Sequence, residues 1–150
     1  MTTPLRLATY NVEWFNNLFN DAGDLLADGH WSGRWNVTRS DQITALGAVF
    51  TAMDADAVIV IEAPDTSRWR QTQTALEGFA NHFGLRANKV LTGFLNNTQQ
   101  QIALMYDPRK MSADHTPQTA KTAPKFDGSF AVDLDQDGQP EPVSWSKPPL

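Results

Sequence analysis

Hydrophobic and polar residues follow one another in the first part of the chain in a pattern that predicts a β-α-β unit. Residues 5–12, LRLATYNV, alternate with the period of two that is typical of a β-strand. Residues 38–53 carry apolar side chains at helical spacing, and Thr38 and Asp41 have the spacing of a helix N-terminal cap. The run AVIVI at 57–61 is apolar on both faces, which predicts a buried central strand parallel to its neighbour. The apolar stripe of the helix consists of Ile43, Leu46, Val49, Phe50 and Met53.

The rest of the chain predicts a second helix and further strands. A helix over 66–83 ends at Gly84, and strands follow at 88–95 and 101–108. A hairpin over 129–145 turns at Asp137–Gly138. No linker divides the chain, so we expect residues 1–150 to belong to a single domain. The expected fold class is α/β (α+β), with a mixed sheet and helices on one face.

One long polar loop interrupts this pattern. Residues 16–36 are rich in Asn, Asp and Gly and contain Trp31 and Trp35. Loops of this length without regular structure are uncommon and are often functional. The alternative is a surface insertion whose tryptophans pack onto the core.

Composition narrows the class of protein. The chain of 150 residues is 41% hydrophobic and 19% charged, which is typical of a globular domain. A net charge of −5 disfavours a protein that coats nucleic acid by charge alone, but it does not exclude an enzyme that brings a metal ion to a phosphate. Without cysteine, a disulfide, a thiolate metal site and a cysteine nucleophile are excluded. No signal-peptide pattern or membrane-length apolar run is visible, so we expect a cytoplasmic protein with no membrane span.

Polar side chains end the two strands of the predicted β-α-β unit. Asn11 ends the first strand, and Glu62 follows the buried run 57–61. Because parallel strands end at the same edge of a sheet, we expect these side chains to meet there. An amide oxygen and a carboxylate suit Mg²⁺ or Mn²⁺, and Glu13 could hold a metal-bound water. The alternative for Glu62 is a strand-end charge that simply reaches solvent.

These segments resemble the endonuclease/exonuclease/phosphatase superfamily. Thr9, Asn11 and Glu13 match its first motif, a strand that ends in Thr-x-Asn with an acid two residues later. Asp56 and Glu62 match its second motif, although Ile61 stands where the family usually has Gln. Residues 101–108, QIALMYDP, are similar to its next strand. The resemblance implies a divalent-metal-dependent phosphodiester hydrolase, nuclease-like, in which Asn11 and Glu62 are catalytic, Asn11 also contacts the substrate, and a nucleic acid is one candidate substrate.

The resemblance covers about half of the family domain, a four-layer α/β sandwich. We therefore expect the N-terminal portion of one such domain, truncated and inactive as a phosphodiesterase on its own, with an exposed sheet face that favours self-association. The family's late Ser-Asp-His-type motif has no match in the sequence. His30, His82 and His115 are interpreted as surface histidines.

Three weaker motifs leave a second function open. DLDQDG at 133–138 has the spacing of a calcium loop, but Ser144 stands at the twelfth position, where the closing Glu belongs. In RWRQ, residues 68–71, a joint surface of Arg68, Trp69 and Arg70 is not expected because neighbouring helix residues point in different directions. Asn97, in an amide-rich loop, could contact the substrate or be a plain turn. The alternative to an enzyme is a non-catalytic remnant or binding module that uses the 133–138 loop or the Trp31/Trp35 loop.

Overall fold

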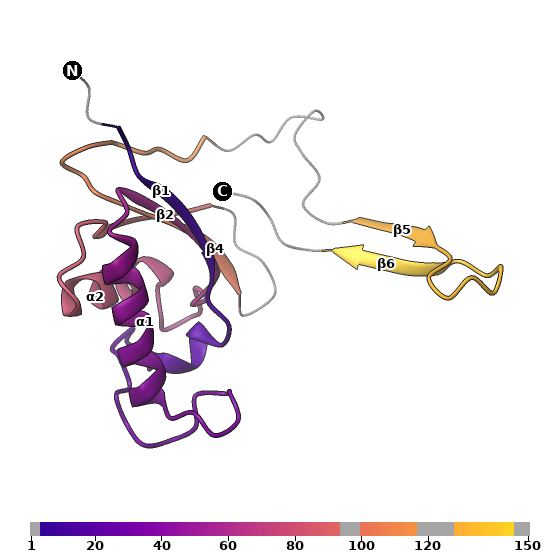
Figure 1. The fold of residues 1–150 in the computed structure, drawn as a ribbon, viewed down its shortest axis with the longest axis horizontal. Coiled ribbons are helices and arrows are strands. Elements are labelled where there is room, and N and C mark those ends of the chain that lie inside the picture. The colour runs from indigo at the N-terminus through magenta and orange to yellow at the C-terminus, as the bar shows by residue number, and fades with distance from the viewer. Residues whose placement is uncertain (1–3, 94–99, 117–127, 146–150) are drawn as a thin grey trace.

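A four-stranded mixed sheet with helices on one face forms the main body of the molecule (Figure 1). The computed structural model describes residues 4–93, 100–116 and 128–145. The strand order is β1-β2-β4-β3, with β1 parallel to β2 and both other pairs antiparallel. The elements of the main body are β1 (Leu7–Asn11), η1 (Phe15–Leu18), α1 (Arg39–Met53), β2 (Ala57–Ala63), α2 (Thr72–His82), β3 (Lys89–Thr92) and β4 (Gln101–Tyr106).

The β-α-β unit predicted from the hydrophobic pattern is confirmed. β1 and β2 pair in parallel and are joined through α1, with Asn11 opposite Ile61 in the register. Thr38 caps α1, since its hydroxyl accepts a hydrogen bond from the Asp41 amide at 3.1 Å. The capping spacing in the sequence therefore marked the true start of the helix.

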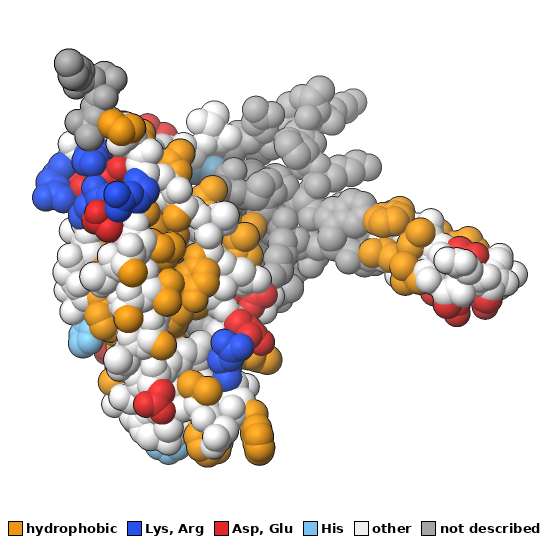
Figure 2. All heavy atoms as spheres, viewed as in Figure 1, with side chains coloured by type: hydrophobic (Ala, Val, Ile, Leu, Met, Phe, Trp, Pro, Cys, Tyr) orange, Lys and Arg blue, Asp and Glu red, His pale blue; other side chains and the backbone are white. Residues whose placement is uncertain are grey.

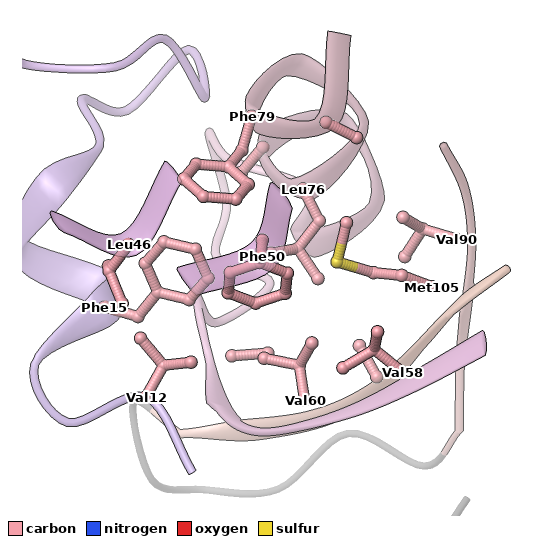
Figure 3. Packing of buried hydrophobic residues seen from close by; sticks show 14 of the residues in the cluster. Val12, Phe15, Leu46, Phe50, Val58, Val60, Leu76, Phe79, Val90 and Met105 are labelled. Carbon is pink, nitrogen blue, oxygen red and sulfur yellow. The ribbon is translucent and has the colours of Figure 1, made fainter. Parts of the chain in front are cut away.

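The core lies between the sheet and the two helices (Figure 3). Phe79 of α2 contacts Phe15 and Phe50 edge-on, with ring centroids 5.2 Å apart in both pairs. Val58 and Val60 of β2 point into this cluster. Of the apolar stripe predicted on α1, Val49 is the exception, because it is exposed at the surface.

The opposite face of the sheet is covered by neither helix. β2 is an inner strand of the sheet, as expected, but it is not buried on both faces, because Ile59 is 41% exposed. The register aligns Thr9, Ile59, Leu104 and Leu91 in one row across this face. The apolar run of β2 therefore serves the core with one set of side chains and leaves the other set on an open face.

Two elements differ from the sequence-based expectation. α2 begins at Thr72, six residues later than predicted, because Ser67 forms a turn in which its hydroxyl accepts hydrogen bonds from the Trp69 and Arg70 amides. The loop at 16–36 is not structureless. It includes η1 and short bridges that pair Phe19 with Leu25 and Trp31 with Thr38.

The second sheet is the predicted hairpin, which lies apart from the main body in Figure 1. β5 (Gly128–Val132) pairs antiparallel with β6 (Glu141–Trp145). Its tip contains the residues of the predicted turn, with Gln136 and Gly138 in left-handed conformations. The prediction of a hairpin here is confirmed.

Ion pairs hold the edge of the sheet where β1 and β2 begin. The buried Asp56 carboxylate binds Arg86 and Lys110, the latter at 2.8 Å, and accepts the Arg6 amide at 2.7 Å. These bonds, that of Lys110 first, hold the pKa of Asp56 below its usual value. Figure 2 shows charged side chains gathered here, near the N-terminal end of β1. Asp56 therefore stabilises the fold through these bonds, and it lies at the opposite end of β2 from Glu62.

Candidate functional site

Asn11 ends β1 on the open face of the sheet. Tyr10, its neighbour, points the other way and lies against Phe50 with 5.6 Å between ring centroids. Because side chains alternate along a strand, Asn11 shares the open face with Thr9. The next amide, that of Val12, still donates to the Ile61 carbonyl at 2.9 Å, which holds the end of β1 against β2. The Asn11 side chain is exposed beside the carboxyl end of β2.

Glu62 occupies a strained position in β2. The pairing with β4 shifts between Ile61 and Ala63, so that Glu62 forms a bulge with φ = 62°. A left-handed conformation costs a residue other than glycine on the order of 1–3 kcal/mol, and such residues cluster at functional sites. β-bulges are likewise frequent beside active sites, where they redirect a side chain. The half-buried Glu62 is thus held by the surrounding fold in a conformation that its own side chain disfavours.

Glu62 lines a pocket of about 210 Å³. Trp14 forms one part of its lining, and Asn16, Asn17 and Gln100 add amide groups. The Asn16 oxygen already accepts a hydrogen bond from Arg70. The Glu62 carboxylate and the Asn17 amide oxygen are of the type that suits a small, hard divalent cation, which retains several waters. The pocket residues other than Glu62 were not predicted, although Asn16 and Asn17 follow the Asn11 motif directly in the sequence. The sequence feature that could have indicated them is a pair of asparagines shortly after the end of the first predicted strand.

Asn11 and Glu13 border a different and larger hollow, of about 680 Å³, between β1 and α1. The structure thus brings the ends of β1 and β2 together, as expected, but it places Asn11 and Glu62 in the linings of two adjacent hollows. The Glu13 carboxylate has a protein partner at each oxygen. Arg34 lies 3.0 Å from one, and the Trp14 indole donates to the other at 3.1 Å. Glu13 therefore orients Arg34 and Trp14 at the mouth of the site.

The single-turn helix η1 connects the two loops that flank this site. Asn17 donates from its side chain to the Ser32 carbonyl at 3.1 Å, which fixes the loop before α1. Asn16 accepts a hydrogen bond from Arg70, a buried residue of the loop before α2. Arg70 also forms an ion pair with Asp65. Two adjacent asparagines thus each hold one loop beside the pocket that they line.

Histidine does not contribute to either hollow. None of His30, His82 and His115 lines the pocket around Glu62 or the hollow beside Asn11. His30 lies 3.2 Å from Asp28, a His–Asp contact that the sequence did not predict, and it is exposed. The His30 backbone amide lowers the pKa of Asp28, with further help from Arg39. This pair stabilises the loop and does not face the candidate site.

The acidic hairpin tip brings four carboxylates together (Figure 2). One ligand oxygen from each lies within 4.8 Å of the others, so this group could hold a metal ion. The sequence did predict three of the four, Asp133, Asp135 and Asp137, but it missed Glu141, which the pairing of β5 with β6 brings to the tip. Glu141 also accepts a hydrogen bond from the Leu134 amide at 2.8 Å.

Asn97, the further substrate contact proposed from the sequence, lies outside the described residues.

Comparisons with known proteins found no related protein. In the described part of the chain no helix has both the length and the apolar character needed to cross a membrane. No known protein family, curated protein or solved structure matches the chain.

Proposed function

We propose that this chain contains the metal-anchoring part of a divalent-metal-dependent phosphodiester hydrolase, nuclease-like, of the endonuclease/exonuclease/phosphatase type. The observation that carries the proposal is the position of Glu62, whose carboxylate lies in a left-handed bulge and lines a pocket of amide and aromatic side chains at the carboxyl end of β2. A strained backbone around a half-buried acid fits a binding site better than a strand end that only meets solvent.

The residues around Glu62 fit Mg²⁺ or Mn²⁺. Glu62 supplies the charged ligand and Asn17 a neutral amide oxygen, whereas the Asn16 oxygen is bound to Arg70. A bound cation would stabilise the negative charge that develops on the phosphate during hydrolysis. Asn11, on the adjacent strand, would orient the phosphodiester, and Glu13 would hold Arg34 toward it. The proposed roles of Asn11 and Glu62 therefore depend on their positions at the same edge of the sheet.

The open face of the sheet supports the finer assignment of the fold. Ile59, Leu104 and Leu91 form an apolar row on the face opposite the helices. In a four-layer sandwich this face packs against a second sheet, while the helices form the outer layer. The arrangement of one sheet with its helices on a single face is the one that this fold requires of each half.

A titration with Mn²⁺, followed by electron paramagnetic resonance of the free ion, tests the proposal. Glu62→Gln should weaken the site by at least about 10-fold, because Glu62 is the one carboxylate among the described residues that line the pocket. Asp135→Asn is the matched control, since it removes one carboxylate from the hairpin tip and leaves the pocket intact. Equal affinity in the wild type and in Glu62→Gln would disprove the proposed site.

A binding module remains the second candidate, favoured by the four carboxylates at the hairpin tip. In that case the hairpin would bind a cation without any catalysis at the sheet edge. The same titration separates the two candidates, because Asp135→Asn would then abolish the binding of Mn²⁺ while Glu62→Gln would not.

A further inference from the structure

Two Arg-Trp dipeptides lie in the two loops that flank the candidate site. One is Arg34–Trp35 in the loop before α1, and the other is Arg68–Trp69 in the loop before α2. Trp35 is 95% exposed and Trp69 is 66% exposed. The tryptophans of the first loop therefore do not pack onto the core. Each exposed indole offers a large flat apolar surface to a ligand.

Both loops are fixed in place. Gly33, directly before the first dipeptide, lies so close to η1 that an added Cβ would be 2.6 Å from the Asn17 side chain. Arg70, directly after the second dipeptide, is buried and donates to Asn16 and to the Phe19 carbonyl. The two exposed tryptophans thus stand on loops anchored to the same helical turn, beside the Glu62 pocket.

The Arg68–Trp69 pair is already stacked. The Arg68 guanidinium lies over the Trp69 ring, 4.6 Å from its centroid. The helix predicted over 66–83 would have kept these side chains apart, but the segment is a turn, and only Arg70 points inward. In the other loop, Glu13 holds Arg34 at 3.0 Å. Each loop therefore presents an indole next to a guanidinium, which is stacked on the ring at Trp69 and paired with Glu13 beside Trp35.

We propose that these two Arg-Trp loops bind the unpaired bases of a single-stranded nucleic acid. Every base offers a flat face to an indole, and an arginine beside the indole can contact the adjoining phosphate. Binding by stacking is compatible with the net charge of −5. In the proposed function, on which this step rests, the bound strand would be the substrate and would bring a phosphodiester to the Glu62 pocket.

The mixed lining of the Glu62 pocket favours a nucleic acid over a lipid surface, because aromatic rings lie there beside a carboxylate and amides. Trp14 and Glu62 share this pocket with the amides of Asn16 and Asn17. A bilayer pressed against these groups would have to desolvate them without offering hydrogen bonds. The edges of bases and the phosphates supply both donors and acceptors.

The test is the fluorescence anisotropy of a labelled oligodeoxythymidylate of about 15 nucleotides, titrated with the full chain in EDTA. Chelation removes any contribution of a metal ion, so the stacking surface is measured alone. Trp35→Ala and Trp69→Ala should each weaken binding by about 5- to 150-fold. Leu134→Ala is the matched control, because Leu134 is 66% exposed on the hairpin, and this variant should bind as the wild type does.

Three results would contradict this proposal. Absence of binding by the wild type, or equal binding by all variants, would overturn the inference. Binding to phosphatidylcholine vesicles with the same tryptophan dependence, and none to the oligonucleotide, would also overturn it and would assign the loops to a membrane. The affinity for Mn²⁺ at Glu62 is measured separately, so failure of the stacking surface and failure of the metal site are told apart.

Discussion

Arg70 donates a hydrogen bond to the side-chain carbonyl of Asn16, 54 residues earlier in the chain. This bond joins the segment that follows β1 to the segment that follows β2. Since Asn11 ends the first strand and Glu62 lies near the end of the second, Arg70 fixes the geometry of the candidate site from outside it.

Arg70→Met should destabilise the fold strongly. The substitution leaves Asp65 without its buried partner, and breaking such a pair costs about 3–5 kcal/mol. Arg68→Met, two residues earlier and exposed, should change the free energy of unfolding by less than about 0.5 kcal/mol. Urea denaturation of both variants measures the difference, and similar losses of stability would show that Arg70 is not the tie between the two segments.

Glu62→Gly should be more stable than Glu62→Ala, by about 1 kcal/mol. Both variants lose the carboxylate, but only glycine adopts φ = 62° without strain. This order is opposite to the usual one within a strand, where glycine weakens the structure. Thermal unfolding of the two variants provides the measurement. If the alanine variant were the more stable, the left-handed bulge would not be the conformation in solution.

Asp107 should make stability depend on pH below about pH 4. Arg109 donates from its side chain and backbone to the buried Asp107 carboxylate, which lowers the pKa from its usual 3.8 to about 2. A pKa that is lower in the folded state means that the stabilisation is complete above pH 4 and is lost as the pH falls toward 2.

Asp107→Asn should therefore be less stable than the wild type at pH 7, and the gap should close between about pH 4 and pH 2. The exposed Asp114→Asn serves as the control and should change the free energy of unfolding by less than about 0.5 kcal/mol. A gap between Asp107→Asn and the wild type that stays constant down to pH 2 would count against this ion pair.

The chain alone should not cleave DNA at a measurable rate. A positioned general base contributes about 10²–10⁴-fold, and no histidine of the described residues lines the pocket around Glu62. The assay follows plasmid and single-stranded DNA with Mg²⁺ and with Mn²⁺ against an EDTA background. Robust cleavage that disappears in Glu62→Ala would show that a base within these residues has been overlooked.

The elements of the fold were predictable where local patterns and packing agree. Thr38 and Asp41 marked the start of α1, and alternation marked β1, because caps and strand faces depend on neighbouring residues. The late start of α2 was missed because the Ser67 hydroxyl satisfies the amides that a helix would have used. The spacing of apolar residues alone does not show that a side-chain hydroxyl competes with the helix for these amides.

The site was predictable only in part. The places of Asn11 and Glu62 at one edge followed from the parallel pairing of their strands. The left-handed conformation of Glu62 has no local signal, because positive φ is expected of Gly or Asn and here tertiary packing imposes it on an acid. Burial of Arg70 likewise depends on Asn16, a partner that no sequence window around Arg70 includes.

The most direct test of the central claim, that Glu62 anchors a divalent cation, is paramagnetic broadening by Mn²⁺ in nuclear magnetic resonance spectra. In the wild type and in Asp135→Asn, low Mn²⁺ should broaden the side-chain amide signals of Asn16 and Asn17, which line the pocket with Glu62. In Glu62→Gln the same signals should remain sharp. Equal broadening of these two amides in the wild type and in Glu62→Gln would contradict the account.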